Sequence, residues 1–327
     1  MSEDAWHLQF QGAQTDRLIA LTGAAPLWSP TLDARDVVGR LAEVEVLLTG
    51  WGAPQLDSEA LERMPRLRAV IHCAGTVRPI VGGDVWSRGI VVSTSADVNA
   101  EPVAEYTLAA IIMAGKRAPF FAADAHRHRE DWRYRGRRGA LGNDGLTIGV
   151  IGYSRIGRRV VRLARDVLHD VNCLVADPYA DAAEVTAAGG TLAELHDMLP
   201  RVEILTIHAP ELASTHHMIG AHELALLPDH ACVINTARGS LIDTAALEAE
   251  CASGRLHAIL DVTDPEPLPA SSVLYDLPNV MLTPHIAGSL GSETLRMTDA
   301  ALDELARFID GEPLGREIRE ADMLHIA

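Results

Sequence analysis

Residues 147–177, TIGVIGYSRIGRRVVRLARDVLHDVNCLVAD, predict a strand, a glycine turn, a helix and a second strand in direct succession. The run 146–151 is short, apolar and rich in β-branched residues, which is typical of a strand buried on both faces of a parallel sheet. Apolar residues then recur at helical spacing from Ile156 to Val167, and a second apolar run, 172–176, ends on Asp177. A chain organised around this unit is expected to be an α/β protein.

The glycines of the turn have the spacing of a dinucleotide-binding loop. In such a loop the first glycine permits a tight bend, the second lets the backbone approach a pyrophosphate, and the third lets helix and strand pack closely. Gly152 and Gly157 fill the first and third places, and Ser154 fills the second. Asp177 lies 20 residues after Gly157, where a carboxylate can bind a ribose and repel a 2′-phosphate. The pattern favours NAD over NADP, although a glycine turn also occurs without a ligand.

The balance of charges limits the partners of the chain. Its 327 residues include 45 acidic and 28 basic side chains, a formal net charge of −17. This argues against a general surface for nucleic acid or for an anionic membrane. The length favours two domains, and the 48% hydrophobic content supplies their cores. The longest apolar run, 108–114, is too short to span a bilayer.

Cysteine and histidine usage indicates the compartment and argues against a metal. Cys73, Cys173, Cys232 and Cys251 are scattered without a Cys-x-x-Cys pair, so we expect buried free thiols. The first residues show no basic and apolar pattern of a leader, so we expect a reducing cytoplasm. The fourteen histidines include no His-x-x-x-His pair, so no metal site is expected.

The first hundred residues alternate strand-like and helical patterns, which predicts a first α/β domain. Its expected strands are 18–21, 44–49, 68–72 and 90–93, and the first fourteen residues are left unassigned. A long helix is expected to open at Asn99, with Pro102 in its first turn, and its length suits a connection between domains.

Residues 126–138, HRHREDWRYRGRR, carry six arginines together with Trp132 and Tyr134. Basic residues interleaved with aromatic ones can bind nucleic acid. The acidic chain as a whole favours a solvated or subunit-contact segment instead.

Four further strand-like runs follow Asp177, at 204–207, 232–235, 258–260 and 280–282. Together with the two around the glycine turn they predict six parallel strands, as in a doubly wound nucleotide domain. An amphipathic helix is expected at 293–309.

Charged residues follow three of these strands. Arg238 and Asp261 come after the runs 232–235 and 258–260, Glu266 follows in the same loop as Asp261, and His285 comes after 280–282. Each alone has a structural explanation, as a turn, a loop or a packed side chain. Because open α/β sheets bind ligands beyond the carboxyl ends of their strands, the shared position favours one functional crevice.

These residue types suit hydride transfer to a 2-oxo acid. An arginine fork binds a carboxylate through two hydrogen bonds and polarises the adjacent carbonyl. A histidine can donate the proton that forms the alcohol. A carboxylate beside that histidine favours its protonated form.

Three motifs, INTARGSLID around Arg238, LDVTDPEPLP around Glu266 and LTPHIAGS around His285, closely resemble those of the D-isomer-specific 2-hydroxyacid dehydrogenases. The resemblance runs from about Trp51 to about Leu305. It includes the glycine turn with Asp177, HAP at 208–210, MIG at 218–220, AGTVRP at 74–79 and NAEPVAEYTL at 99–108.

The resemblance implies two domains and a small-molecule 2-oxo acid or 2-hydroxy acid as substrate. A Rossmann-type doubly wound nucleotide domain would span 102–293, and a smaller flavodoxin-like α/β substrate domain would combine 1–101 with 294–327. A cleft between them would close on the ligand. Members of this family are usually dimers joined through their nucleotide domains, so a homodimer is expected.

The matching motifs also imply roles for single residues. Arg238 would bind the substrate carboxylate and carbonyl, His285 would be the acid/base, and Glu266 would orient it. The residues expected to bind NAD are Gly152, Tyr153, Ser154, Arg155, Ile156, Gly157, Asp177, His208, Ala209, Pro210, Thr236, Ala237 and Asp261. Those expected to bind the substrate are Ala74, Gly75, Thr76, Arg78 and Asn99, with Asn99 at the hinge.

Two departures from the family pattern leave alternatives open. Ser154 replaces the middle glycine, which bears on cofactor affinity. Arg78 stands where many relatives carry acidic residues, so it is either a surface arginine or a contact for a second anionic group. The chain could therefore oxidise a phosphonate or phosphite. The fold also occurs in NADH-sensing corepressors, although the intact Arg238, Glu266 and His285 argue against that role.

Overall fold

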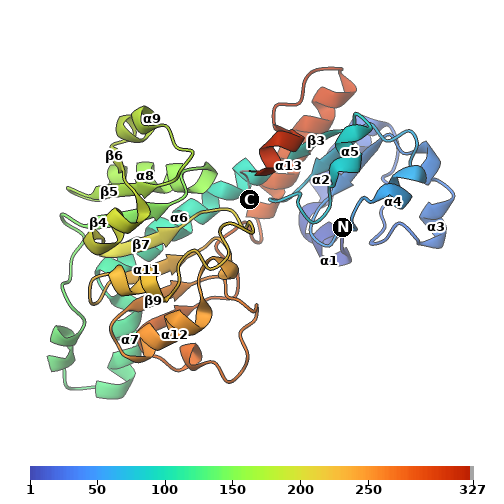
Figure 1. Ribbon diagram of the computed structural model, residues 1–327. Coiled ribbons are helices and arrows are strands. Elements are labelled where there is room, and N and C mark those ends of the chain that lie inside the picture. Colours follow the sequence, from blue (N-terminus) through green and yellow to red (C-terminus); the bar gives the residue numbers. More distant parts are fainter. Residues whose placement is uncertain (325–327) are drawn as a thin grey trace. The chain divides into compact units, whose positions relative to one another are not determined.

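The computed structural model describes residues 1–324. The chain forms two compact units (Figure 1). Unit 1 contains Met1–Ala100 and the residues from Ser289 onward, and unit 2 contains Glu101–Gly288. Unit 2 is thus a continuous segment, whereas unit 1 is made from both ends of the chain. That unit 1 holds the substrate and unit 2 the cofactor stays a prediction.

Unit 2 is built on a seven-stranded parallel sheet with the order β10-β9-β8-β7-β4-β5-β6. The strand order reverses at β4, where a ligand crevice forms in doubly wound sheets. The strands are β4 Thr147–Ile151, β5 Asn172–Ala176, β6 Gly190–Leu192, β7 Ile204–Ile207, β8 Cys232–Asn235, β9 His257–Leu260 and β10 Val280–Leu282.

Helices accompany these strands in unit 2. They are α7 Ala118–His128, α8 Arg155–Val167, α9 Ala182–Ala187, α10 Leu195–Met198, α11 Ala221–Leu226 and α12 Thr244–Ala252. Helix α6, Ala96–Gly115, begins in unit 1 and continues into unit 2. Short 3-10 segments lie at η2 Arg133–Arg137, η3 Leu199–Arg201, η4 Gly239–Leu241 and η5 Val273–Tyr275.

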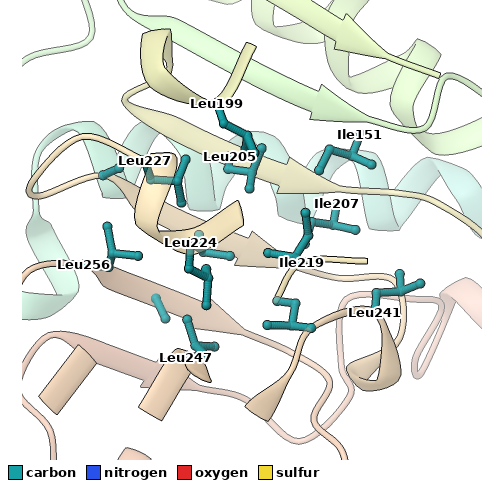
Figure 2. Packing of buried hydrophobic residues seen from close by; sticks show 14 of the residues in the cluster. Ile151, Leu199, Leu205, Ile207, Ile219, Leu224, Leu227, Leu241, Leu247 and Leu256 are labelled. Carbon is teal, nitrogen blue, oxygen red and sulfur yellow. The ribbon is translucent and has the colours of Figure 1, made fainter. Parts of the chain in front are cut away.

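Both faces of the larger sheet are buried. Successive residues of a strand point to opposite faces, so neighbouring residues belong to different cores. Ile204 of β7 belongs to the core that includes α6 and α8. Leu205 and Ile207 belong to the opposite core, with residues of α11 and α12 such as Leu224 and Leu247 (Figure 2). The continuous apolar runs of the sequence are therefore those of a doubly covered parallel sheet.

Unit 1 contains a four-stranded sheet with the order β1-β2-β3-β11, in which β11 is antiparallel to β3. Its strands are β1 Val46–Thr49, β2 Ala69–His72, β3 Val91–Thr94 and β11 Glu317–Ile318. Its other elements are α1 Glu3–Gln9, α2 Gly12–Thr22, α3 Arg35–Val38, η1 Leu41–Glu43, α4 Ser58–Glu62, α5 Gly83–Ser87, α13 Glu293–Ile309 and η6 Glu320–Leu324.

The predicted α/β class with a doubly wound nucleotide sheet and a smaller α/β part is confirmed. Three details were wrong. The expected strand 18–21 lies in helix α2, with Leu18 buried and Ile19 exposed. The long helix begins at Ala96, so Pro102 lies in its interior. The larger sheet has a seventh strand, β6, whose three residues carry little apolar signal.

The cysteines are free and buried, as expected. Burial raises the pKa of the Cys73, Cys232 and Cys251 thiols to about 12 and that of Cys173 to about 11. Along the described chain, the helices lack the combination of length and apolar character that crossing a membrane requires.

Candidate active site

The glycine turn lies at the carboxyl end of β4 and has the tight bend that its sequence predicts. Gly152 has φ +86°, and a Cβ there would lie 2.7 Å from the backbone nitrogen of Ala209. A Cβ on Gly157 would overlap the carbonyl oxygen of Gly152. Ser154, by contrast, has φ −92°, and its side chain accepts a hydrogen bond from Arg155 N at 2.6 Å as the N-cap of α8. The middle position therefore needs no glycine conformation here.

Asp177 follows β5 and lies against the glycine turn. Its Oδ2 accepts a hydrogen bond from Tyr153 N at 2.7 Å, and its Oδ1 accepts one from Tyr179 N at 2.8 Å. The carboxylate is therefore fixed beside the loop at the N-terminus of α8, where a phosphate group is favoured. A tight glycine turn, a helix start and a fixed carboxylate fit a dinucleotide.

The segment 208–210 follows β7 and closes over Gly152. The side chain of His208 is buried, and its Nε2 lies 3.0 Å from Thr206 Oγ1. Burial lowers the pKa of His208 to about 3, so the ring is neutral. Ala209 is buried as well. If this segment binds the cofactor as predicted, the backbone is the group that it offers.

The turn after β8 positions Arg238. Asn235 holds this turn, because its Oδ1 accepts a hydrogen bond from Ala237 N at 3.0 Å and its Nδ2 donates to Arg238 O at 2.8 Å. The Arg238 guanidinium is about one-third exposed and lies 3.9 Å from a carboxylate oxygen of Glu211. Ser240 Oγ donates to the other oxygen of Glu211 at 2.7 Å. A carboxylate thus already faces the predicted carboxylate-binding arginine.

Asp261, directly after β9, is 1% exposed and organises the loop that carries His285. Its Oδ1 accepts hydrogen bonds from Thr283 Oγ1 at 2.6 Å and from Ile286 N at 2.8 Å, and its Oδ2 accepts one from Ala287 N at 2.8 Å. The backbone oxygen of Asp261 accepts from His285 N at 2.9 Å. Asp261, which the motifs predict to bind NAD, is therefore also the anchor of the next loop.

His285 pairs with Glu266, as the motifs predicted. Its Nδ1 lies 2.7 Å from Glu266 Oε1, and both side chains are about half exposed. His285 has φ +54°, which is uncommon for a residue with a side chain and marks functional sites when the surroundings enforce it. A cavity of about 620 Å³ lies beside the pair, lined by Asp261, Glu266, Thr283 and Pro284 among others.

The residues expected to bind substrate lie in unit 1, after β2 and at the start of α6. The single hydroxyl proton of Thr94 is shared between the carbonyl oxygens of Ala74 and Gly75. Thr76 Oγ1 accepts from Arg78 N at 3.3 Å, and the Arg78 guanidinium donates to the carbonyl oxygen of Met323. The Asn99 amide nitrogen lies 3.6 Å from the position of a Cβ on Gly75. These residues therefore form one group.

Asn99 also lies where the chain passes between the units. Its Oδ1 accepts a hydrogen bond from Ser289 N at 2.9 Å, and Ser289 is the residue at which the chain re-enters unit 1. The bond ties together the two backbone segments that cross the boundary. Its role as a hinge residue stays a prediction.

Three residues near the site were not foreseen. Tyr106 and Thr283 share a hydrogen bond of 2.8 Å, and Glu211 faces Arg238. Thr283 and Tyr106 belong to the motifs LTPHIAGS and NAEPVAEYTL, so the motifs contained them without indicating that they touch. Glu211 directly follows Pro210, and nothing in its sequence context signals Arg238.

Groups with metal-ligand chemistry occur at two places in the described chain. His196, His222 and Glu223 form one group, and His216, His217 and Asp264 form the other. The histidines of both groups are exposed, and Glu223 is already held by Gly220 N and His196. Neither group includes a residue that was predicted to be catalytic.

Comparison with known proteins identifies the family. Residues 108–287 match the family of the D-isomer specific 2-hydroxyacid dehydrogenase, NAD binding domain. A glyoxylate reductase of Aeropyrum pernix is 32% identical over 266 residues, covering 79% of this chain and 78% of that protein. A D-3-phosphoglycerate dehydrogenase of Mycobacterium tuberculosis is 30% identical over 285 residues, covering 86% of this chain and 52% of that protein.

The chain thus spans about half the length of the phosphoglycerate dehydrogenases that it matches. Among solved structures, the D-lactate dehydrogenase of Aquifex aeolicus, complexed with NAD and lactic acid, is 26% identical with a TM-score of 0.69. The match covers 84% of this chain and 85% of that one. The predicted cofactor, NAD, agrees with the matched domain. The chain belongs to the D-isomer specific 2-hydroxyacid dehydrogenase family, whose members are NAD-dependent oxidoreductases acting on the CH–OH group of 2-hydroxy acids.

Proposed function

We propose that the protein is an NAD-dependent D-2-hydroxyacid dehydrogenase that reduces a small 2-oxo acid in the reverse direction. The observation that carries the proposal is the 2.7 Å pair of His285 and Glu266. This pair lies beyond the carboxyl ends of β9 and β10, at the same edge of the sheet as Arg238 and the glycine turn. The names of the glyoxylate reductase and D-lactate dehydrogenase relatives support a small substrate.

The chemistry divides between the cofactor and the chain. A bound nicotinamide would supply the hydride for reduction and accept it for oxidation. Arg238 binds the substrate carboxylate through its guanidinium and polarises the neighbouring carbonyl, with charge-assisted hydrogen bonds that contribute on the order of 1.5–3 kcal/mol each.

His285 moves the proton. Because Glu266 engages Nδ1, the ring exchanges its proton with the substrate oxygen through Nε2. The donated proton completes the alcohol, and the neutral ring takes a proton back from solvent. The contact of Nδ1 with the carboxylate of Glu266 fixes the orientation of the ring. In the oxidative direction the same nitrogen accepts the proton.

The assay that tests this proposal follows NADH consumption with glyoxylate, hydroxypyruvate, pyruvate, phenylpyruvate, 2-oxoglutarate and phosphonopyruvate. Turnover of one or more of them is the expected result. A preference for the acids with a second anion would assign Arg78 to that anion. NADH binding without turnover across the panel would contradict the proposal and favour a sensing role.

We also place the protein in the cytoplasm as a homodimer joined through the nucleotide units. The four free thiols support a reducing compartment. The family resemblance supports the dimer, and sedimentation equilibrium measures it directly.

A further inference from the structure

Helix α6 directs two consecutive hydroxyl side chains at two different loops of unit 2. Tyr106 Oη lies 2.8 Å from Thr283 Oγ1, and Thr107 Oγ1 lies 3.0 Å from Thr236 Oγ1. Consecutive residues of a helix point about 100° apart, so a single turn of α6 reaches both loops. Thr283 precedes His285 by two residues, and Thr236 precedes Arg238 by two residues.

The two loops come from strands that are not neighbours. Thr236 follows β8, Thr283 follows β10, and β9 lies between these strands. With strands spaced about 4.8 Å apart, β8 and β10 are roughly 10 Å from each other. Backbone hydrogen bonds from Thr283 N to Leu260 O and from His285 N to Asp261 O, both at 2.9 Å, already tie the loop after β10 to the segment of β9. The hydroxyls of α6 supply a second point of attachment for each loop.

The donor directions on the Tyr106 side follow from the chemistry of the groups. Thr283 Oγ1 donates its only proton to Asp261 Oδ1 at 2.6 Å, since an ionised carboxylate can only accept. Tyr106 must therefore donate to Thr283. Burial raises the pKa of Tyr106, as does the charge of Asp261, against the opposing effect of its bond to Thr283. The phenol thus keeps its proton at neutral pH.

This row of hydrogen bonds ends on the backbone of the acid/base loop. The same carboxylate of Asp261 accepts from Ile286 N and Ala287 N, which directly follow His285. His285 itself has φ +54°, a conformation that is uncommon for a residue with a side chain. Tyr106 therefore supports the group that holds His285 in this conformation.

The Thr107 side is more deeply buried. Thr107 is 0% exposed and Thr236 is 6% exposed, so water does not replace this hydrogen bond easily. Asn235 holds the turn from one side and Thr107 holds it from the other. The direction in which the Arg238 side chain leaves the turn depends on both.

We propose that Tyr106 and Thr107 are positioning residues with separate tasks, Tyr106 for His285 in proton transfer and Thr107 for Arg238 in carboxylate binding. The assignment of tasks rests on the proposed function. The attachment of each loop to α6 does not, because it concerns hydrogen bonds within this chain alone.

The kinetic experiment compares Tyr106→Phe and Thr107→Val. Tyr106→Phe should lower kcat about 3- to 10-fold, the effect of one hydrogen bond, with KM for the oxo acid nearly unchanged. Thr107→Val should raise that KM by a similar factor with kcat nearly unchanged, and Thr107→Ser should restore it. Matched controls are Tyr134→Phe, a buried tyrosine of η2, and Thr298→Val, a buried threonine of α13 whose hydroxyl donates to the carbonyl oxygen of Thr294 one turn earlier.

A second readout needs no turnover. Amide hydrogen exchange should accelerate at 285–287 in Tyr106→Phe and at 236–239 in Thr107→Val, with each variant leaving the other loop as in the wild type. The proposal would be overturned if each variant accelerated exchange equally in both loops. It would also be overturned if both variants had the exchange and the kinetics of the wild type. A different outcome is a wild type that is inactive on every oxo acid, with the two variants still showing the expected acceleration of exchange. That outcome would contradict the proposed function alone.

Discussion

Nδ1 of His285 lies 2.7 Å from Oε1 of Glu266. The backbone of His285 is left-handed, and its N–H donates a hydrogen bond to the carbonyl oxygen of Asp261. The carboxylate therefore selects which ring nitrogen faces a substrate, and the backbone selects where the ring points. Both properties are needed for a proton donor, whereas a surface histidine needs neither.

Replacing His285 by Ala should lower kcat by about 10²- to 10⁴-fold, the usual contribution of a general acid. NADH affinity should stay within about twofold, because no part of the glycine turn changes. Stopped-flow kinetics and NADH fluorescence titration measure the two quantities. Retained turnover would remove the acid/base assignment.

Arg238→Lys should reduce kcat/KM for the oxo acid by roughly 10- to 100-fold, because a point charge cannot replace a planar fork with two donors. Most of the loss should fall on KM. Arg137→Lys, a conservative change on an exposed residue of η2, serves as the control. An unchanged specificity constant would contradict the carboxylate-binding role.

The glycine turn gives a matched pair of variants. Gly157→Ala places a methyl group against the carbonyl oxygen of Gly152 and should abolish NADH binding or fold stability. Ser154→Gly should lower the free energy of unfolding by only a few tenths of a kcal/mol, since glycine is nearly as good a helix cap as serine. Isothermal titration with NADH, together with thermal unfolding, distinguishes the two. Equal affinities would show that the turn does not hold the cofactor.

Asp177→Asn keeps an oxygen that accepts from the backbone but removes the negative charge. We expect the preference for NADH over NADPH to fall by about tenfold or more, because the repulsion of a 2′-phosphate disappears. The ratio of kcat/KM for the two cofactors measures it. A ratio equal to that of the wild type would place the ribose elsewhere.

Three buried histidines predict sensitivity to acid. Burial lowers the pKa of His208 and His257 to about 3 and that of His72 to about 4, all below the ordinary value near 6.5. The unfolded chain therefore binds more protons below pH 6.5. The stabilisation is complete above that pH and is lost as the pH falls toward 3 to 4.

For each such histidine the free energy of unfolding should fall by up to about 1.4 kcal/mol per pH unit in that window. Urea unfolding at pH 7.5, 6.0 and 5.0 measures the slope. His257→Phe, which keeps a ring stacked on Phe120 at 4.7 Å between centroids, should reduce it. A slope identical in wild type and variant would show that His257 does not titrate with unfolding.

The larger sheet could be predicted well because its strands are continuous apolar runs, and the edges of β7, β8 and β10 agree with the predicted ranges. The prediction of a strand at residues 18–21 was wrong because a run of four apolar residues fits a strand or a helix equally. The helix places Leu18 in the core and exposes Ile19, a difference that only the packing against Ile71 and Leu302 decides. Strands β6 and β11 are too short to carry a pattern.

The pairing of His285 with Glu266 followed from motif resemblance, and the structure places the two side chains together. The contacts of Tyr106 and Thr107 could not be predicted, because they join positions more than a hundred residues apart through hydroxyl groups. Ser154 could be judged only from its backbone angle. Sequence showed which residue is unusual there, and the structure shows that its backbone conformation does not require glycine.

Strand β11 at Glu317–Ile318 has a consequence for how the protein is made. It pairs with β3 from the first hundred residues, while unit 2 is continuous from 101 to 288. During synthesis, in which domains fold as units while the chain emerges, the larger unit can finish before the smaller one has its fourth strand. Residues 1–100 are thus synthesised before unit 2, but their sheet is completed after it, once Glu317 and Ile318 have emerged.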